Sequence, residues 1–195
     1  MFRELESTTR HDNIVFVDEV GFAVVTRPKR GRSPVGQSAY CYVNAARSRN
    51  ISVAAAINKN GIIYSKIHES ALNGETFKMF LVELKNACVE KGVLNPVFVM
   101  DNARIHHYNG LNQTLIDERI EIRYLPPYSP FLNPIENVFS VWKNLVIRKK
   151  CQNEVDLKDA IESCFSDITY EHCDGFYRKM LRYVTMSSRG ETILE

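Results

Sequence analysis

Two short apolar runs, each closed by an aspartate, most constrain what this chain can fold into. Residues 14–17 read Ile-Val-Phe-Val and precede Asp18, and residues 97–100 read Val-Phe-Val-Met and precede Asp101. Apolar runs without alternating polar residues are typical of strands covered on both faces, as in a sheet packed between helices. Because sites in open α/β sheets lie at the carboxyl ends of the strands, Asp18 and Asp101 are candidates for one shared site.

The other elements predict a hairpin followed by alternating helices and strands. Strands 51–57 and 62–67 flank the turn Asn-Lys-Asn-Gly at 58–61, where Asn-Gly favours the positive φ angles of a tight hairpin. The apolar spacing then predicts, in chain order, helix 75–91 ended by Gly92, strand 96–100, strand 120–124, helix 134–149 with Trp142 in its apolar stripe, and two amphipathic helices within 154–185.

The order of these elements predicts how the strands pair. Helix 75–91 must cross over, because the strands on either side of it cannot pair through a tight turn. Strands 14–19 and 96–100 can then lie side by side and parallel. The predicted fold class is α/β, with a mixed five-stranded sheet made of a three-strand antiparallel meander plus two parallel strands, and helices on both faces.

A third carboxylate, Glu136, opens a helix directly after the proline-rich segment 125–134. Three carboxylates brought together repel, by about 1 kcal/mol per pair at 4 Å in water and about 4 kcal/mol at an effective dielectric near 20. A divalent cation relieves this repulsion, and hard oxygen ligands select Mg²⁺ or Mn²⁺. If the three acids converge, we expect Asp18, Asp101 and Glu136 to hold such a cation.

Each acid also has a purely structural explanation. Asp18 and Asp101 could end their strands as turn-forming residues. Glu136 could complete a capping box, with Asn133 at the N-cap and Pro134 at the first helical position.

Composition limits the class of protein. A chain of 195 residues with 45% hydrophobic and 25% charged residues is ordinary for one soluble globular domain. Five cysteines without a Cys-x-x-Cys pair favour reduced thiols in an intracellular protein over disulfides or a zinc site. The beginning of the chain does not resemble a signal peptide, and no apolar run approaches the roughly 20 residues of a membrane span. We expect a nuclear location if the host is eukaryotic and a cytoplasmic one otherwise.

Positive charge is concentrated in one stretch, although the net charge of +2 alone does not argue for nucleic acid. A solvated loop or a nuclear-import signal would also explain this stretch, but we favour contact with DNA phosphates. The residues of the basic stretch are Arg27, Lys29, Arg30, Arg32, Arg47 and Arg49.

Three motifs together resemble the catalytic domain of mariner-type DNA transposases, within the superfamily of transposases and retroviral integrases. They are Val-Asp-Glu at 17–19, Asp-Asn-Ala-Arg-Ile-His at 101–106, and Pro-Pro-Tyr-Ser-Pro at 126–130 running into Asn-Pro-Ile-Glu at 133–136. The resemblance covers roughly residues 12–150, and the last motif is the most specific. It implies a ribonuclease H-like fold and a DDE triad formed by Asp18, Asp101 and Glu136.

The resemblance also implies a chemistry, namely cleavage of DNA and strand transfer during transposition and integration. Two Mg²⁺ ions, or Mn²⁺ as a substitute, would activate the attacking water or 3′ hydroxyl and stabilise the leaving oxygen. We expect Asp18 to bridge the two ions, with Asp101 on one and Glu136 on the other. The implied partners are transposon ends and target DNA, and the resemblance allows a homodimer. In such relatives the insertion after the first strand forms a clamp that touches DNA and the partner subunit.

Two further residues are candidates for DNA contact. His106 matches a histidine of the family pattern and could orient a phosphate or a carboxylate, or merely decorate a loop. A zinc site formed by His106 and His107 is disfavoured, because adjacent histidines point in different directions. Lys143 lies nearly two helical turns after Glu136 on the same face, within reach of a phosphate near the metals.

We expect residues 1–195 to form a single DDE catalytic domain, with a core at about 12–150 and C-terminal helices at 154–185 packed on it. The few residues before the first strand are too short for the helix-turn-helix module that reads transposon ends. The alternative function is that of a captured transposase remnant that binds DNA or protein without catalysis.

Overall fold

The computed structural model describes residues 9–24, 32–40, 50–69, 71–108 and 110–193. Its centre is a five-stranded sheet in the order β3-β2-β1-β4-β5. β1 to β3 form an antiparallel meander, whereas β4 runs parallel to both β1 and β5. The predicted mixed sheet is confirmed, and its first strand continues three residues beyond the predicted end. The strands are β1 (Ile14–Phe22), β2 (Ile51–Asn58), β3 (Gly61–His68), β4 (Val97–Met100) and β5 (Glu121–Tyr124).

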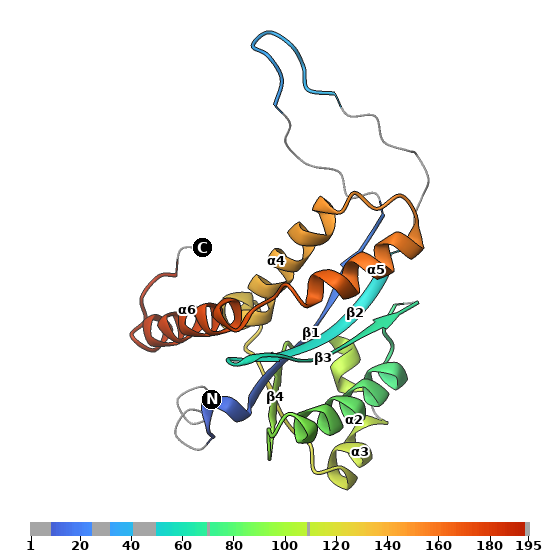
Figure 1. Cartoon of the computed structure of the whole chain (residues 1–195). Helices are drawn as coiled ribbons and strands as arrows, with labels where there is room; N and C mark the ends of the chain where they lie inside the picture. The colour runs from blue at the N-terminus through green and yellow to red at the C-terminus, as the bar shows by residue number, and fades with distance from the viewer. Residues whose placement is uncertain (1–8, 25–31, 41–49, 70, 109, 194–195) are drawn as a thin grey trace.

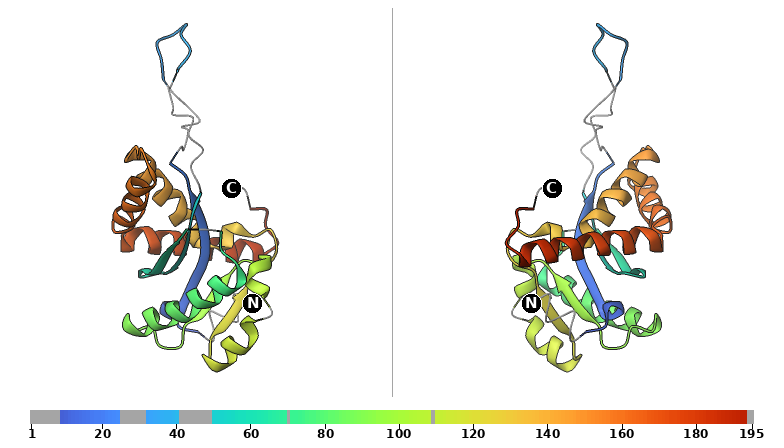
Figure 2. Two further views of the ribbon diagram at one scale, coloured as in Figure 1. Left: turned by 90° about the vertical axis from the view of Figure 1, so that its right-hand side faces the viewer. Right: turned by 90° about the vertical axis from the view of Figure 1, so that its left-hand side faces the viewer.

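Helices cover both faces of the sheet. Figure 1 shows α2 (Gly74–Glu90) and α3 (Leu111–Asp117) on one side and the last three helices on the other. The two side views keep these groups apart (Figure 2). None of the helices in the described part of the chain is long and apolar enough to cross a membrane. The last three helices are α4 (Pro134–Arg148), α5 (Glu154–Phe165) and α6 (Tyr170–Ser188), and the short 3₁₀ helices are η1 (His11–Asn13), η2 (Arg104–His107) and η3 (Pro130–Leu132).

Side chains of β1 alternate between two hydrophobic clusters, as the two-residue period of a strand requires. Phe16 and Val20 pack against the cluster under α4, α5 and α6, whereas Val15 and Val17 pack against the cluster under α2. The strand is buried on both faces up to Val17, which explains the unbroken apolar run. The alternation also places Asp18, between Phe16 and Val20, on the α4 side.

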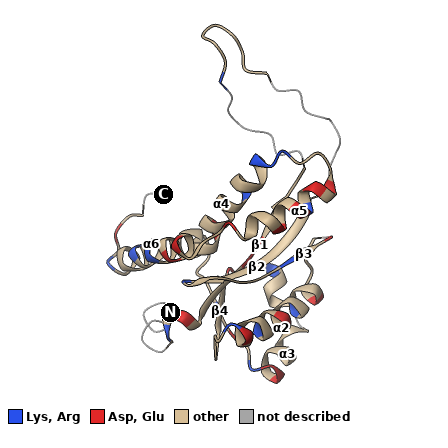
Figure 3. Cartoon of the chain, viewed as in Figure 1, with Lys and Arg blue, Asp and Glu red and all other residues tan. Residues whose placement is uncertain are grey.

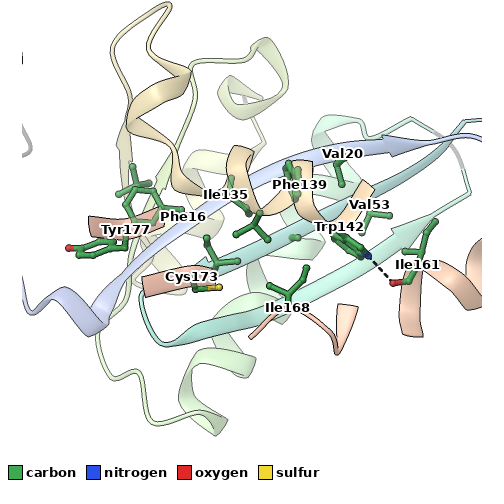
Figure 4. Packing of buried hydrophobic residues seen from close by; sticks show 14 of the residues in the cluster. Phe16, Val20, Val53, Ile135, Phe139, Trp142, Ile161, Ile168, Cys173 and Tyr177 are labelled. Carbon is green, nitrogen blue, oxygen red and sulfur yellow. Dashed lines mark hydrogen bonds between the residues drawn. The ribbon is translucent and has the colours of Figure 1, made fainter. Parts of the chain in front are cut away.

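Trp142 anchors α4 to the sheet and to α5, as its central position in the apolar stripe predicts. Its side chain is 1% exposed and meets the ring of Phe22 edge-to-face at 5.2 Å between ring centroids. The indole Nε1–H donates to the main-chain oxygen of Ile161 at 3.0 Å (Figure 4). The one polar atom of a large buried aromatic is thereby satisfied, so its burial stabilises the fold without leaving an unpaired donor.

Turns and caps follow local sequence rules where nothing else competes for the side chains. α2 begins with a capping box between Asn73 and Thr76. After α2, Gly92 adopts a φ of +73° and ends the helix as predicted. The β2–β3 hairpin forms at the predicted place, and there Gly61 takes the positive φ, of +141°.

Candidate active site

Strand pairing brings the two aspartates to the same edge of the sheet. The parallel register between β1 and β4 aligns Phe16 with Val99, so two further residues bring Asp18 beside Asp101. Phe16 and Val99 both belong to the cluster beneath α4. Because side chains two residues apart share a face, both acids lie on the α4 side. Asp101 directly follows β4, whereas Asp18 lies within β1, so the prediction that Asp18 ends its strand is wrong.

The proline-rich segment delivers the third acid to the same place. It passes through η3 and enters α4 at Pro134, which leaves Glu136 in the first turn of the helix. A pocket of about 400 Å³ is lined by Asp18, Asp101, Glu136, Asn133 and residues 125–130. The structure therefore brings all three sequence-predicted acids into one pocket wall.

Asp18 is the most deeply enclosed of the three acids. One carboxylate oxygen, Oδ1, accepts from the main-chain N–H of Glu19 at 2.8 Å, and Oδ2 accepts from the side-chain Nδ2 of Asn133 at 2.9 Å. Burial raises the pKa of Asp18 to about 8, and the negative charges of Glu136 and Asp101 add to the effect. A carboxylate in this setting is poorly stabilised as an anion by protein groups alone.

Asp101 is half exposed and is held by its own loop. Its Oδ1 accepts from the main-chain N–H of Ala103 at 3.0 Å, and Nδ1 of His106 lies 3.0 Å from the same oxygen. The ring of His106 is 2% exposed and packs against Phe77 at 4.5 Å between ring centroids. The expected DNA contact by His106 is not supported, because a buried ring offers no surface to a phosphate. Of the roles left open for it, orienting a carboxylate fits this position.

Glu136 lies at the rim of the pocket. Partial burial raises the pKa of its carboxyl, the charge of Lys143 lowers it, and the charge of Asp101 raises it. Lys143 itself is exposed on α4. The positive charge of this lysine therefore acts on the acid that the helix presents to the pocket.

The predicted capping box at the start of α4 is wrong. Asn133 is the N-cap residue, but its side chain makes no cap hydrogen bond and donates to Asp18 instead. It is 1% exposed, and its Oδ1 has no hydrogen-bond partner among the described residues. Asn133 is thus a site residue that sequence reasoning assigned to a local role. Its only sequence signal is its place between the proline segment and Glu136.

The donor chemistry of the pocket fits a hard divalent cation. Its acids offer only oxygen atoms, and burial, together with the neighbouring negative charges, raises the pKa of Asp18, so a bound cation would stabilise its anionic form. Within the described ranges, however, no three His, Cys, Asp or Glu side chains already form a group that could hold a metal. The three acids therefore line one wall of the pocket but do not form a metal-ligand cluster in this structure.

The side chains of His106 and His107 point to different neighbours. His106 packs against Phe77, whereas His107 packs on Tyr124 at 4.5 Å between ring centroids.

Most of the basic stretch lies outside the described residues, namely Arg27, Lys29, Arg30, Arg47 and Arg49. Within residues 32–40, which are described, every residue is exposed, including Arg32. Figure 3 shows further Lys and Arg residues at the carboxyl end of α4 and along α6, the latter mixed with acidic residues. The DNA contacts expected of these side chains therefore stay predictions.

Comparison with protein families identifies one matching model. It is described as DDE superfamily endonuclease, and it matches residues 13–158. This range contains all three acids and ends early in α5. A search of curated proteins found no match.

Solved structures with a similar fold come from Mos1 transposase. The catalytic domain of Mos1 mariner transposase matches with a TM-score of 0.74 and 17% identity, over 98% of this chain and 89% of that one. The Mos1 paired-end complex with the left transposon end matches with a TM-score of 0.80 and 19% identity, over 99% of this chain and 60% of that one. The mariner Mos1 paired-end complex with Mg matches with a TM-score of 0.82 and 19% identity, with the same coverage.

The TM-scores establish a common fold, so the predicted ribonuclease H-like fold is confirmed. This chain spans about 60% of the length of the transposase chains in the paired-end complexes.

Proposed function

We propose a catalytic function for this chain on the premise that it belongs to the DDE superfamily endonuclease family. The proposed function is that of a DNA transposase catalytic domain, which cuts DNA phosphodiester bonds and joins strands with the help of divalent metal ions. One observation carries the proposal. Three acids from β1, the end of β4 and the start of α4 line one pocket, and burial and mutual charge raise the pKa of one of them, Asp18, to about 8.

In this proposal Asp18, Asp101 and Glu136 hold Mg²⁺ or Mn²⁺, at two ions per site. Bound divalent ions supply activation of the attacking water or 3′ hydroxyl and stabilisation of the leaving oxygen. Two of the similar structures are Mos1 paired-end complexes with Mg and with Mn, which supports this choice of metal.

The protein groups around the acids position them for this chemistry. The Asn133 amide fixes one oxygen of Asp18, so the carboxylate keeps its direction toward the pocket. The Ala103 N–H fixes Oδ1 of Asp101 in the same way, and the His106 ring, which contacts the main-chain oxygen of Asp101, lies 3.0 Å from that Oδ1. Lys143, whose charge already acts on Glu136, supplies positive charge for a phosphate at the pocket rim.

The proposed partner is DNA, both as transposon ends and as target. The Mos1 complexes with transposon ends support this choice. Arg32 and the other basic residues between β1 and β2 would contact phosphates. A homodimer is part of the proposal, with the exposed segment 32–40 as surface for a second copy. Sedimentation of the chain with and without DNA tests the dimer, and an exclusively monomeric protein in both conditions would contradict it.

No observation in the pocket favours the alternative of a remnant that binds without catalysis, since all three acids line it. The two functions differ in whether DNA is cut. Incubation of the chain with supercoiled plasmid and millimolar Mg²⁺ or Mn²⁺ should yield nicked circles. Glu136→Gln should abolish nicking, because an amide lacks the anionic oxygen that the metal requires.

The control is thermal unfolding without metal. Glu136 makes no cap hydrogen bond in the structure, so Glu136→Gln should melt near the wild-type temperature in EDTA. Nicking at the wild-type rate by Glu136→Gln would show that this acid is not needed for the reaction. An absence of nicking by the wild type at any metal concentration would instead favour the non-catalytic alternative.

A further inference from the structure

A second pocket adjoins the catalytic pocket at Glu136. It has a volume of about 390 Å³ and lies between η3, the first turns of α4, and α6. Pro130 and Glu136 line both pockets, so the two hollows meet at these residues. A strand whose scissile phosphate enters the catalytic pocket can therefore continue directly into the second one.

The cationic group of the second pocket is Lys179 on α6. Its ammonium donates to Oδ1 of Asn137 at 3.2 Å and lies over the ring of Tyr183, 5.6 Å from the ring centroid. These contacts hold a partly buried lysine in one place at the pocket wall. An ammonium has three N–H donors, and Asn137 accepts one of them, so a phosphate oxygen can accept another. A positioned cation also loses less side-chain entropy on binding than a free one.

The remainder of the wall suits a nucleotide better than a free anion. Phe131 and Tyr183 meet edge-to-face at 5.8 Å between ring centroids, and both rings are only partly buried. Aromatic rings beside a cation are the combination that proteins use to hold single nucleotides of a strand. The negative charge of Glu136 would repel a phosphate, but Lys143 lies on the same face of α4 and opposes that charge.

We propose that the second pocket is a subsite for the nucleotide next to the scissile phosphate, with its phosphate on Lys179. Phe131 and Tyr183 pack against the sugar and base of that nucleotide. Lys179 is then a substrate-binding residue contributed by a C-terminal helix that lies beyond the part matched by the family model. The inference rests on the proposed function, since it requires DNA in the neighbouring pocket.

The test compares the 195-residue chain with Lys179→Gln and Lys179→Arg, using fluorescence anisotropy with a short DNA duplex over a series of salt concentrations. Lys158→Gln is the matched control, because Lys158 is also partly exposed and pairs with Glu69 on another surface. We expect Lys179→Gln to bind DNA several-fold more weakly at low salt. Its slope of log affinity against log salt should flatten by about 0.9, the contribution of one phosphate contact. Lys179→Arg and Lys158→Gln should behave as the wild type does.

A second readout separates substrate binding from a structural role. In plasmid nicking, Lys179→Gln should raise KM several-fold with little change in kcat, and its metal-free melt should match that of Lys158→Gln. An affinity and salt slope equal to those of Lys158→Gln would overturn the subsite while leaving the proposed function intact. A wild-type chain that neither binds nor nicks DNA would overturn both.

Discussion

The two halves of the pocket edge hold their acids by different means. In the β1–α4 half, Asp18 accepts from Asn133, a residue 115 positions away in the sequence. In the β4–η2 half, Asp101 contacts Ala103 and His106, which lie two and five residues further along the chain. The first contact exists only when α4 has docked on the sheet, whereas the second can form within one loop. Assembly of the pocket therefore depends on tertiary packing in one half and on a local turn in the other.

The two halves also differ in how their acids affect the stability of the folded chain. Burial raises the pKa of Asp18 to about 8, so an ionised Asp18 is unfavourable without a cation. The side chain of Asp101 is 52% exposed, and water can solvate its charge. One acid therefore opposes folding while its neighbour does not, although the proposed chemistry needs both.

Replacing each aspartate by asparagine gives the largest expected effects. Asp18→Asn and Asp101→Asn should both lose plasmid nicking by orders of magnitude, because neither amide replaces an anionic metal ligand. Their melting temperatures in EDTA should diverge. Asp18→Asn should melt above the wild type since it removes a buried ionisable group, and Asp101→Asn should change little since its Oδ1 can still accept from Ala103. Equal melting temperatures for the two variants would remove the contrast between the halves.

The pH dependence of the free energy of unfolding should contain a contribution from Asp18, in the β1–α4 half. Between the ordinary pKa of 3.8 and the folded pKa of about 8, folded Asp18 retains a proton that the unfolded chain releases. The free energy of unfolding should therefore fall as pH rises through this window, by at most about 1.4 kcal/mol per pH unit. Denaturant melts in EDTA between pH 5 and pH 8 measure the slope. Subtracting the curve of Asp18→Asn isolates it, and parallel curves would mean that Asp18 is not enclosed as described.

Asn133→Ala removes the amide that donates to the Asp18 carboxylate. We expect nicking activity and Mg²⁺ affinity to fall roughly 10–100-fold, as when a group that orients a metal ligand is removed. Unfolding free energy should change by less than about 1 kcal/mol, since the lost bond to Asp18 is offset by removal of a buried oxygen that has no partner in the described structure.

The matched control for Asn133→Ala is Asn58→Ala. Asn58 is 2% exposed, donates to the main-chain oxygen of Asp12 at 2.8 Å and accepts from the N–H of Asn60 at 2.9 Å. Its loss should lower stability by about 1–3 kcal/mol and leave nicking per folded molecule unchanged. If Asn133→Ala behaves like Asn58→Ala, Asn133 is a structural residue only.

The smallest expected effect concerns the proline-rich segment between β5 and α4. Tyr128 is 99% exposed, lines the pocket and has a φ of +58°, in the left-handed region that disfavours a side chain. Tyr128→Gly should change unfolding free energy by at most about 1 kcal/mol, because relief of backbone strain opposes the greater entropy of unfolded glycine. Lys150→Gly, at a φ of +53° beyond the pocket lining, is the control. Nicking should fall only in Tyr128→Gly, and equal nicking by both variants would exclude a role for the ring.

Local periodicity was enough to predict the part of the site that lies on strands. The unbroken run before Asp18 and the run before Asp101 identify buried strands, and a crossover helix makes them parallel neighbours. Glu136 follows from the proline segment, which ends where α4 begins. The pairing of these elements and the shared pocket edge could therefore be predicted without coordinates.

The parts that were missed depend on competition between partners far apart in the sequence. Asn133 satisfies every local rule for a helix cap, yet its side-chain amide donates to the buried Asp18 carboxylate. His106 lies in a polar motif, yet Phe77 of α2 covers its ring. No window of neighbouring residues contains either partner, so local rules could not reveal these contacts.

The strand order has a consequence for how the chain is made. β1 is synthesised first, yet it lies at the centre of the sheet between β2 and β4. At about 5–20 residues per second, β4 leaves the ribosome several seconds after β1. During that interval β1 can pair with β2 while its other edge stays open, and open strand edges invite association between chains. Synthesis must then proceed past α4 before the Asp18 carboxylate meets its amide partner. A nascent chain that stalls between these points would expose unpaired main-chain N–H and C=O groups of β1 and would lack an assembled active site.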